Sequence, residues 1–273
     1  MPQPNAVRWL LTLCLLVPLI SQAAEPLPSW YSGSSRQAIE QFVTAVTETG
    51  GKDYVAPADR IAVFDNDGTL WSEQPMYFEF MFAMDEVKRL APQHPEWKTQ
   101  QPFKAVLDGD QKALAATGMD GLLKIVAATH SGVSTEQFIA QTRSWLSRAV
   151  HPKTKKPYTE MVYAPMLELL QYLRDNGFKT YIVSGGEVAF MRAFAEEVYG
   201  IPPEQVIGTT LDSRFEDKNG KLSVLRLPKL VHNDDGPGKP VSIDNIIGRR
   251  PILAFGNSDG DLQMLQWTMV GNG

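Results

Sequence analysis

Apolar residues along the chain follow two alternating patterns: short uninterrupted runs, and longer stretches with helical spacing. Within residues 34–48, the spacing of one helix face is kept by Ile39, Phe42, Val43 and Val46. Residues 60–64 form a short apolar run, which predicts a buried strand. By the same criteria we expect helices at 34–48, 164–176, 187–199, 242–247 and 262–267, and strands at 60–64, 179–183, 205–211, 221–225 and 251–255.

The order of these elements predicts the fold class. Strands that alternate with helices favour a parallel sheet with right-handed crossovers, so we expect an α/β protein with a Rossmann-like parallel sheet and helices on both faces. Asn219-Gly220 predicts a hairpin turn between two extended segments. Ligands of such sheets bind outside the carboxyl ends of the strands, which is where we expect the site.

Residues 75–158 interrupt this alternation. They contain no convincing strand and predict only helices, at 76–90, 111–116, 121–129 and 135–149. We therefore divide the chain into a core, residues 25–74 and 159–273, and an all-helical cap insertion, residues 75–158. Four aromatic residues near the start of the cap line a pocket in one interpretation and pack inside the cap in the other, which helical spacing favours. These residues are Tyr77, Phe78, Phe80 and Phe82.

Residues 1–24 resemble a targeting segment. Arg8 precedes an apolar run at 9–20, and small residues follow at 21–24. This pattern predicts a cleavable signal peptide and a periplasmic or secreted protein, with an uncleaved N-terminal anchor as the alternative. Cys14, the only cysteine, lies in this segment, and no later stretch is long and apolar enough to span a membrane.

Composition narrows the function classes only slightly. The chain has 273 residues, 43% of them hydrophobic and 21% charged, as expected for a globular protein. Its net charge of −5 argues against a nucleic-acid-binding protein, which needs a basic face. The histidines lack the spacing of zinc ligands, and we expect them in loops or on the surface. They are His94, His130, His151 and His232.

The strongest candidate chemistry lies directly after the predicted strand 60–64. Asp65 and Asp67 are two residues apart in a tight loop that Gly68 permits. Two carboxylates so close repel each other unless a cation lies between them, and magnesium prefers oxygen ligands. An Asx-turn or a helix cap is the structural alternative.

Four segments together resemble the motifs of the haloacid-dehalogenase-like hydrolases. Residues 64–70, Phe-Asp-Asn-Asp-Gly-Thr-Leu, are similar to the first motif, and Ser184 at the end of a predicted strand is similar to the second. Lys239, which opens a predicted helix, is similar to the third, and residues 256–261 are similar to the acidic fourth. The cap lies between motifs one and two, as in the phosphoserine-phosphatase-like branch of the family.

The resemblance implies a role for each motif residue. Asp65 is the nucleophile that forms an aspartyl-phosphate, and Asp67 is the general acid and base. Ser184 and Lys239 hold the phosphoryl group. The resemblance further implies phosphate binding by Thr69 and Gly185.

The implied cofactor is magnesium, held by Asp65, Asp67, Asn257 and Asp261. Asp67 contributes its backbone carbonyl in the family pattern. Asn257 departs from that pattern, because the family places an aspartate there; its amide oxygen can ligate magnesium but brings no charge.

We therefore expect a magnesium-dependent, exported phosphatase that hydrolyses a small phosphomonoester. The cap favours a small substrate, and an aspartate at position 67 argues against dehalogenation. Glu73 and Gln74 lie near the place of a substrate-selecting glutamate of phosphoserine phosphatases. Two alternative functions stay open: transfer of the phosphoryl group to a small alcohol, and binding of phosphate or metal by a catalytically weak protein. The sequence specifies neither the substrate nor the oligomeric state. The chain ends soon after the fourth motif, which is consistent with a C-terminal truncation.

Overall fold

A computed structural model describes residues 25–270 of the chain. The predicted signal peptide, residues 1–24, lies outside the described residues, so its cleavage and the periplasmic or secreted location stay predictions. Within residues 25–270, no helix is both long and apolar enough to cross a membrane.

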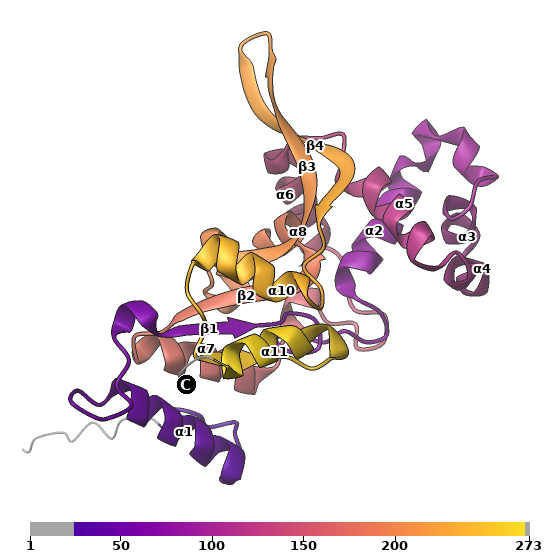
Figure 1. The fold of residues 1–273 in the computed structure, drawn as a ribbon. Coiled ribbons are helices and arrows are strands. Elements are labelled where there is room, and N and C mark those ends of the chain that lie inside the picture. Colours follow the sequence, from indigo (N-terminus) through magenta and orange to yellow (C-terminus); the bar gives the residue numbers. More distant parts are fainter. Residues whose placement is uncertain (1–24, 271–273) are drawn as a thin grey trace, which may run out of the picture.

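The core is a five-stranded sheet in the order β4-β3-β2-β1-β5 (Figure 1). The strands are β1 (Ile61–Phe64), β2 (Lys179–Glu187), β3 (Val206–Lys218), β4 (Lys221–His232) and β5 (Leu253–Phe255). β1 pairs in parallel with both β2 and β5, and β2 pairs in parallel with β3. The predicted α/β class with a mainly parallel sheet is thus confirmed; the antiparallel strand β4 makes the sheet mixed.

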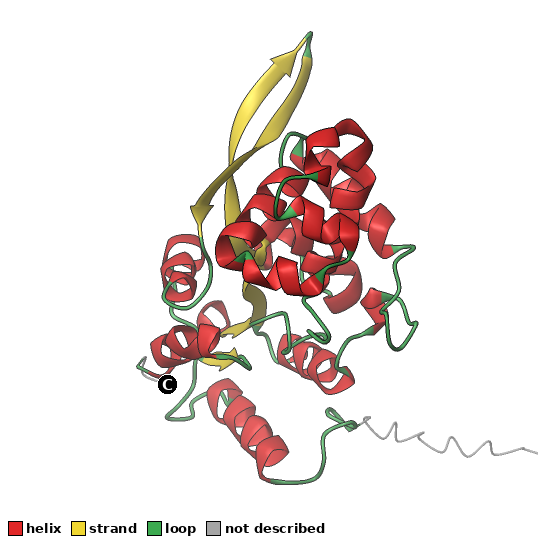
Figure 2. Cartoon of the chain, turned by 90° about the vertical axis from the view of Figure 1, so that its right-hand side faces the viewer, coloured by secondary structure: helices red, strands yellow, loops and turns green. Residues whose placement is uncertain are grey.

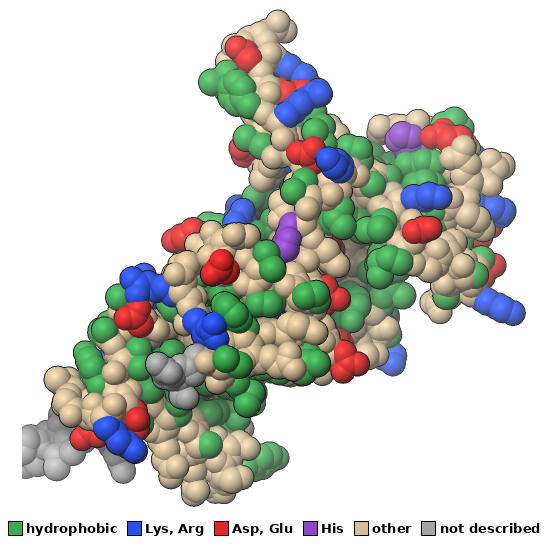
Figure 3. Space-filling view, viewed as in Figure 1, with side chains coloured by type: hydrophobic (Ala, Val, Ile, Leu, Met, Phe, Trp, Pro, Cys, Tyr) green, Lys and Arg blue, Asp and Glu red, His purple; other side chains and the backbone are tan. Residues whose placement is uncertain are grey.

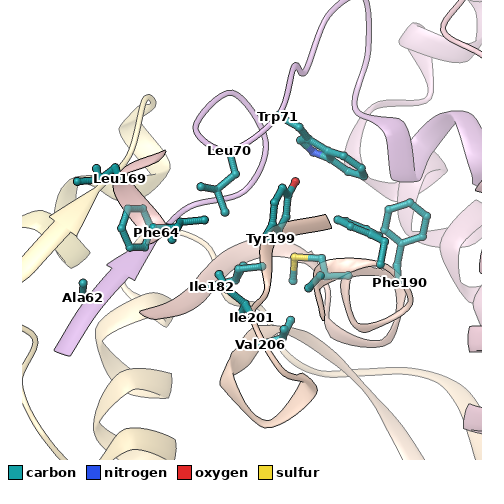
Figure 4. Close-up of a cluster of buried hydrophobic side chains, with 14 of the residues drawn as sticks. Ala62, Phe64, Leu70, Trp71, Leu169, Ile182, Phe190, Tyr199, Ile201 and Val206 are labelled. Atoms are coloured by element: carbon teal, nitrogen blue, oxygen red, sulfur yellow. The ribbon is translucent and has the colours of Figure 1, made fainter. Parts of the chain in front are cut away.

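Helices cover both faces of the sheet because successive residues of β1 point to opposite sides. Ala62 and Phe64 join a large apolar cluster with α1 (Ser34–Thr47) and α7 (Ala164–Asp175), seen in part in Figure 4. Ile61 and Val63 pack on the other face against the π-helical turn η6 (Ile243–Ile247), which follows α10 (Gly238–Ser242), and against α11 (Leu262–Met269). All four residues of β1 are buried, which explains its uninterrupted apolar run.

The segment predicted as a cap contains helices and no strand among its described residues. Its α-helices are α2 (Phe78–Leu90), α3 (Phe103–Asp108), α4 (Gln111–Ala116), α5 (Gly118–His130) and α6 (Thr135–Leu146). Ala83, Trp97 and Ile125 belong to a separate apolar cluster inside the cap. Phe78 and Phe82 instead join the main core cluster, so the base of the cap is packed onto the core. The domain limits at 75 and 158 stay a prediction.

The hairpin of β3 and β4 is longer than predicted. Its turn lies at Asn219-Gly220 as expected, and both residues have left-handed φ angles, 58° and 81°. β3 first pairs with β2 and then leaves the sheet to pair with β4. Figure 2 shows the hairpin projecting beside the cap helices. The prediction ended β3 at residue 211, before its mostly polar and exposed outer residues 212–218, and ended β4 at residue 225, before its partly exposed inner residues 226–232.

Two predicted helices also differ from the observed ones. The helix expected at 187–199 is two short helices, α8 (Val188–Arg192) and α9 (Ala195–Tyr199). Phe194 separates them, with a φ of −133°, and its ring stacks on Trp71 at 4.3 Å. The helix expected at 242–247 begins earlier, at Gly238, so that Lys239 lies in its first turn.

Candidate active site

The predicted motif residues converge at the carboxyl edge of the sheet. Asp65 and Asp67 follow β1, Ser184 and Gly185 lie near the end of β2, and Lys239 lies in α10. These five residues line one cavity of about 560 Å³. Thr69, Asn257 and Asp261 lie beside it: the Thr69 hydroxyl donates a hydrogen bond to Oδ1 of Asn257 at 3.1 Å.

Lys239 lies between two carboxylates. Its Nζ donates to Oδ1 of Asp65 at 2.8 Å and to Oδ1 of Asp261 at 2.5 Å, and only 1% of the residue is exposed. Burial alone would lower the pKa of Lys239, but the two negative charges outweigh it and raise this pKa. Burial and the charge of Asp261 raise the pKa of Asp65 despite the lysine.

Asp261 positions this lysine and the loop before it. While Oδ1 accepts from Lys239, Oδ2 accepts the backbone N–H groups of Asn257 and Ser258, both at 2.9 Å. The residue has no exposed surface. Asp261 therefore holds Lys239 and the loop through both of its oxygens, and its predicted part in the metal site stays a prediction.

Asp67 is held by a residue that the sequence analysis missed. The indole N–H of Trp71 donates to Oδ1 of Asp67 at 2.7 Å. Burial, with the charges of Asp65 and Glu79, raises the pKa of Asp67 to about 7, although the Trp71 hydrogen bond opposes the shift. A carboxyl group with such a pKa can donate or accept a proton near neutral pH. Trp71 is fully buried, and Figure 4 shows it among the aromatic side chains of the core.

Two contacts fix the loop that carries the two aspartates. The Tyr199 hydroxyl donates to Oδ1 of Asn66 at 3.0 Å, and both residues are buried. Gly68 has a φ of 83°, and a Cβ placed there would lie 2.1 Å from Nδ2 of Asn257. Glycine is therefore required both for the turn and for the close approach of Asn257.

The segment that begins at Ser184 lines the same cavity as Asp65. Ser184 is 1% exposed, and the strand register shifts between Ser184 and Glu187. The Thr209 hydroxyl donates to the carbonyl oxygen of Gly185 at 2.7 Å and so fixes this segment. Since this segment lines the same cavity as Lys239, its hydroxyl and backbone N–H groups are suitable donors to an anion.

Glu79 of the cap reaches the core at this segment. Its Oε2 accepts the backbone N–H of Glu187 at 2.8 Å, and its Oε1 lies 3.4 Å from Nε2 of His130. Thr129 donates its hydroxyl hydrogen to the carbonyl oxygen of Ile125, so it accepts from Nδ1 of His130. Nδ1 therefore carries a hydrogen, and Nε2 faces the Glu79 carboxylate without a hydrogen bond.

Two histidines are buried, which corrects a surface position for both: His130 ends helix α5, and His151 lies in a loop, as expected. His130 is 0% exposed and His151 is 4% exposed. The Nε2 of His151 lies 2.7 Å from the carbonyl oxygen of Gln74, just before the cap. Each ring has a hydrogen-bond partner in the interior, which is the usual state of a buried polar side chain.

The aromatic residues of the early cap divide between the two predicted roles. Tyr77 and Phe80 line the cavity, whereas Phe78 and Phe82 are fully buried in the core. Glu73 also lines the cavity, next to the motif-one loop.

Arg226 of β4 joins the hairpin, cap and core. Its Nε donates to the carbonyl oxygen of His130 at 2.7 Å, and its Nη2 lies 2.9 Å from Oε1 of Glu187. The guanidinium also lies over the ring of Phe138 at 4.2 Å. The contact fixes the hairpin beside the cavity and was invisible in the sequence, since its partners are far apart in the chain.

The donors near Asp65 are suited to a hard cation that keeps part of its water shell. Across residues 25–270, no group of three or more His, Cys, Asp or Glu side chains is placed to hold a metal ion. The side chain of Asn257 lies against Gly68 in the motif-one loop, with its Nδ2 toward the glycine and its Oδ1 accepting the Thr69 hydroxyl. One carboxylate, one backbone carbonyl and one amide oxygen fit magnesium, which retains several waters.

The fold and site define an α/β protein with an aspartate–lysine centre at the carboxyl edge of its sheet. A family model described as haloacid dehalogenase-like hydrolase matches residues 62–266. Since the match covers well over half of the chain, the protein belongs to this family, and the predicted family is confirmed.

Several solved structures are similar to the chain. A conserved protein of unknown function from Anaerococcus prevotii DSM 20548 is 19% identical, with 84% of this chain and 81% of that chain covered and a TM-score of 0.46. A phosphoserine phosphohydrolase-like protein from Francisella tularensis is 17% identical, with 76% and 82% covered and a TM-score of 0.41. A probable phosphoserine phosphatase from Vibrio cholerae is 18% identical, with 79% and 56% covered and a TM-score of 0.39. A search of curated proteins found no match.

Proposed function

We propose that the protein is a magnesium-dependent phosphatase that hydrolyses a small phosphomonoester through an aspartyl-phosphate on Asp65. The observation that carries the proposal is the pairing, in one cavity, of Asp65 with Lys239 at 2.8 Å and with Asp67, whose pKa is raised to about 7. A nucleophile, a cation and a proton carrier are the three groups that this reaction needs.

In the first step, a carboxylate oxygen of Asp65 attacks phosphorus and the bond from phosphorus to the alcohol oxygen breaks. Asp67, protonated, gives its proton to the departing alcohol. In the second step, the deprotonated Asp67 takes a proton from water, whose oxygen attacks the aspartyl-phosphate. Phosphate leaves and Asp65 is restored, so neither aspartate is consumed.

The remaining residues bind and orient the phosphoryl group. Lys239 has a buried positive charge beside Asp65, where it offsets the negative charge of both the nucleophile and the phosphoryl oxygens. Ser184 and the backbone at Gly185 face the same cavity and supply hydrogen-bond donors. Thr69 is placed differently: its hydroxyl is directed to Asn257, so we propose that it orients this amide and acts on phosphate only indirectly.

The residues that would hold magnesium are Asp65, the backbone carbonyl of Asp67, and the amide oxygen of Asn257. When bound, the ion neutralises the charge of the phosphoryl oxygens. Because Asn257 has no charge, we propose that this chain binds magnesium more weakly than an enzyme with aspartate at that position.

The test is hydrolysis of para-nitrophenyl phosphate by the purified protein with magnesium and with a chelator, beside Asp65→Asn. The matched control is Asp53→Asn, which alters a solvent-exposed aspartate outside the cavity. We expect magnesium-dependent hydrolysis that Asp65→Asn abolishes and Asp53→Asn retains. Activity that persists in Asp65→Asn would contradict the mechanism.

The same assay separates the alternatives. If added alcohols yield new phosphate esters at the expense of free phosphate, the protein is a phosphotransferase that uses the same intermediate. If the folded protein turns over no ester with any divalent metal, it is a binding protein, and Asn257 is the first residue to examine. The predicted export is tested separately, by locating the full-length protein after cell fractionation.

A further inference from the structure

Helix α5 carries apolar side chains on two faces. One face packs into the apolar cluster of the cap, through residues such as Ile125. The other face lines the cavity of the proposed active site, at the spacing of one helix stripe. This stripe consists of Met119, Leu122, Leu123, Val126 and Ala127. Met119 is 67% exposed and Leu123 is 42% exposed, so the protein itself does not cover the stripe.

Other apolar side chains line the cavity with the stripe. Tyr77 and Phe80 come from the cap, and Leu211, Pro228 and Leu230 come from the hairpin. Figure 3 shows hydrophobic side chains gathered where the cap faces the base of the hairpin. The cavity thus combines the polar groups of Asp65, Ser184 and Lys239 with extensive apolar walls.

The charges around the cavity are almost all negative. Glu73, Glu79, Glu187 and Asp235 line it in addition to the two aspartates of the first motif. Lys239 is the one basic residue among the described residues of the lining, and both Asp65 and Asp261 already pair with it. A second anionic group on a substrate would therefore meet carboxylates and no free cation.

We propose that the alcohol part of the substrate is an extended apolar group without negative charge, and that it binds on the α5 stripe and the hairpin. The proposal rests on the proposed phosphatase function, which places the phosphoryl group at Asp65. The apolar walls continue directly from that position within one cavity, so an alkyl or aryl chain attached to the phosphate covers the stripe. Phosphorylated carboxylic acids and amino acids are then poor substrates.

The first experiment compares kcat/KM for three esters with magnesium present: ethyl phosphate, hexyl phosphate, and the hexyl ester that ends in a carboxylate. Full burial of one methylene is equivalent to about a fourfold gain, so four extra methylenes that are half buried give about 15-fold for hexyl over ethyl phosphate. We expect the terminal carboxylate to remove this gain. Equal values for ethyl and hexyl phosphate, or faster turnover of the carboxylate ester, would overturn the proposal while the phosphatase function stood.

The second experiment locates the apolar site with matched variants. Leu123→Ser removes a large side chain from the stripe, whereas Leu222→Ser removes one from the exposed tip of the hairpin, outside the cavity. We expect the hexyl-to-ethyl ratio of kcat/KM to fall about three- to fivefold in Leu123→Ser and to stay unchanged in Leu222→Ser. An unchanged ratio in Leu123→Ser contradicts the placement.

Binding of alkylphosphonates, which cannot be hydrolysed, keeps the proposal testable without catalysis. We expect hexylphosphonate to bind more tightly than ethylphosphonate by calorimetry, and Leu123→Ser to reduce the difference. If no ester is hydrolysed but this difference is found, the phosphatase function fails and the apolar site stands. If the two phosphonates bind equally, the apolar site is refuted whatever the activity.

Discussion

Replacement of Lys239 by methionine tests the buried charge arrangement at the site. Methionine keeps an unbranched chain of similar length, so the main change is the loss of the ammonium group. Asp65 and Asp261 then remain buried with no cation between them, at 6% and 0% exposure. Removal of one partner from a buried ion pair costs about 3–5 kcal/mol. We expect Lys239→Met to lower the free energy of unfolding by about 3 kcal/mol at pH 8. This value is the lower end of the range, because an unpaired carboxylate can take up a proton and so reduce the cost.

Asp65→Asn is predicted to have a much smaller effect on stability. It removes one of the two negative charges and leaves Lys239 paired with Asp261 at 2.5 Å. We expect the stability to change by less than about 1 kcal/mol, and Asp65→Asn/Lys239→Met to be less destabilised than Lys239→Met alone. The assay is urea unfolding followed by circular dichroism with a chelator present, so that metal binding does not contribute.

The control is Lys52→Met, since the Lys52 side chain is 91% exposed and is expected to contribute less than about 0.5 kcal/mol. The cost of Lys239→Met should also shrink as the pH falls toward 4, because protonation neutralises the unpaired carboxylates. A cost below about 1 kcal/mol at pH 8, or one that does not depend on pH, would refute the argument that Lys239 compensates two buried charges.

Three further variants probe the proton carrier and the metal donors. The raised pKa of Asp67 means that the folded protein binds its proton more tightly than the unfolded chain, so ionisation of Asp67 reduces stability as pH rises from about 4 through about 7. Asp67→Asn should therefore stabilise the metal-free protein by about 2 kcal/mol at pH 8 and not at pH 3 in urea titrations, and should slow turnover about 10²–10⁴-fold. Trp71→Phe removes the hydrogen bond that lowers the pKa of Asp67, so the limb of the pH–rate profile due to Asp67 should move up by about half a unit; a shift to lower pH contradicts this. Asn257→Asp adds a charge to the proposed metal donors and should lower the magnesium concentration for half-maximal activity about tenfold; an unchanged concentration would place the ion elsewhere.

The motif residues were predictable from sequence because each follows or opens a regular element whose position the fold dictates. Asp65 follows an apolar strand, and parallel strands bring their carboxyl ends to one edge. The distances within the site were not predictable. The sequence did not show that Asp261 accepts hydrogen bonds from Lys239 through one oxygen and from the backbone through the other.

The residues that the sequence analysis missed act through long-range contacts. Glu79 and Glu187 are 108 positions apart, and Arg226 and His130 are 96 positions apart. No local pattern distinguishes such residues from ordinary surface charges. Trp71 left a weak signal, as a bulky donor four residues after Asp67, but only the folded loop shows that its N–H reaches the carboxyl.

The hairpin and the α5 stripe show a second limit. β3 and β4 contain many exposed residues, so apolar patterning marked only part of each strand: the sheet end of β3 at 205–211 and the tip end of β4 at 221–225. The stripe on α5 reads as ordinary helix packing in the sequence, because apolar residues on two faces of a helix give the pattern of a buried helix. The structure separates the face that packs in the cap from the face that lines the cavity.

The central claim is that Asp65 is phosphorylated during turnover. It is tested most directly by acid quench of the protein during hydrolysis of para-nitrophenyl phosphate, followed by mass spectrometry of its peptides. We predict one phosphoryl group on the peptide that contains Asp65, more of it in Asp67→Asn because loss of the base slows the second step, and none in Asp65→Asn. A phosphoryl group on another residue, or hydrolysis at full rate with no labelled peptide in either protein, would contradict the account.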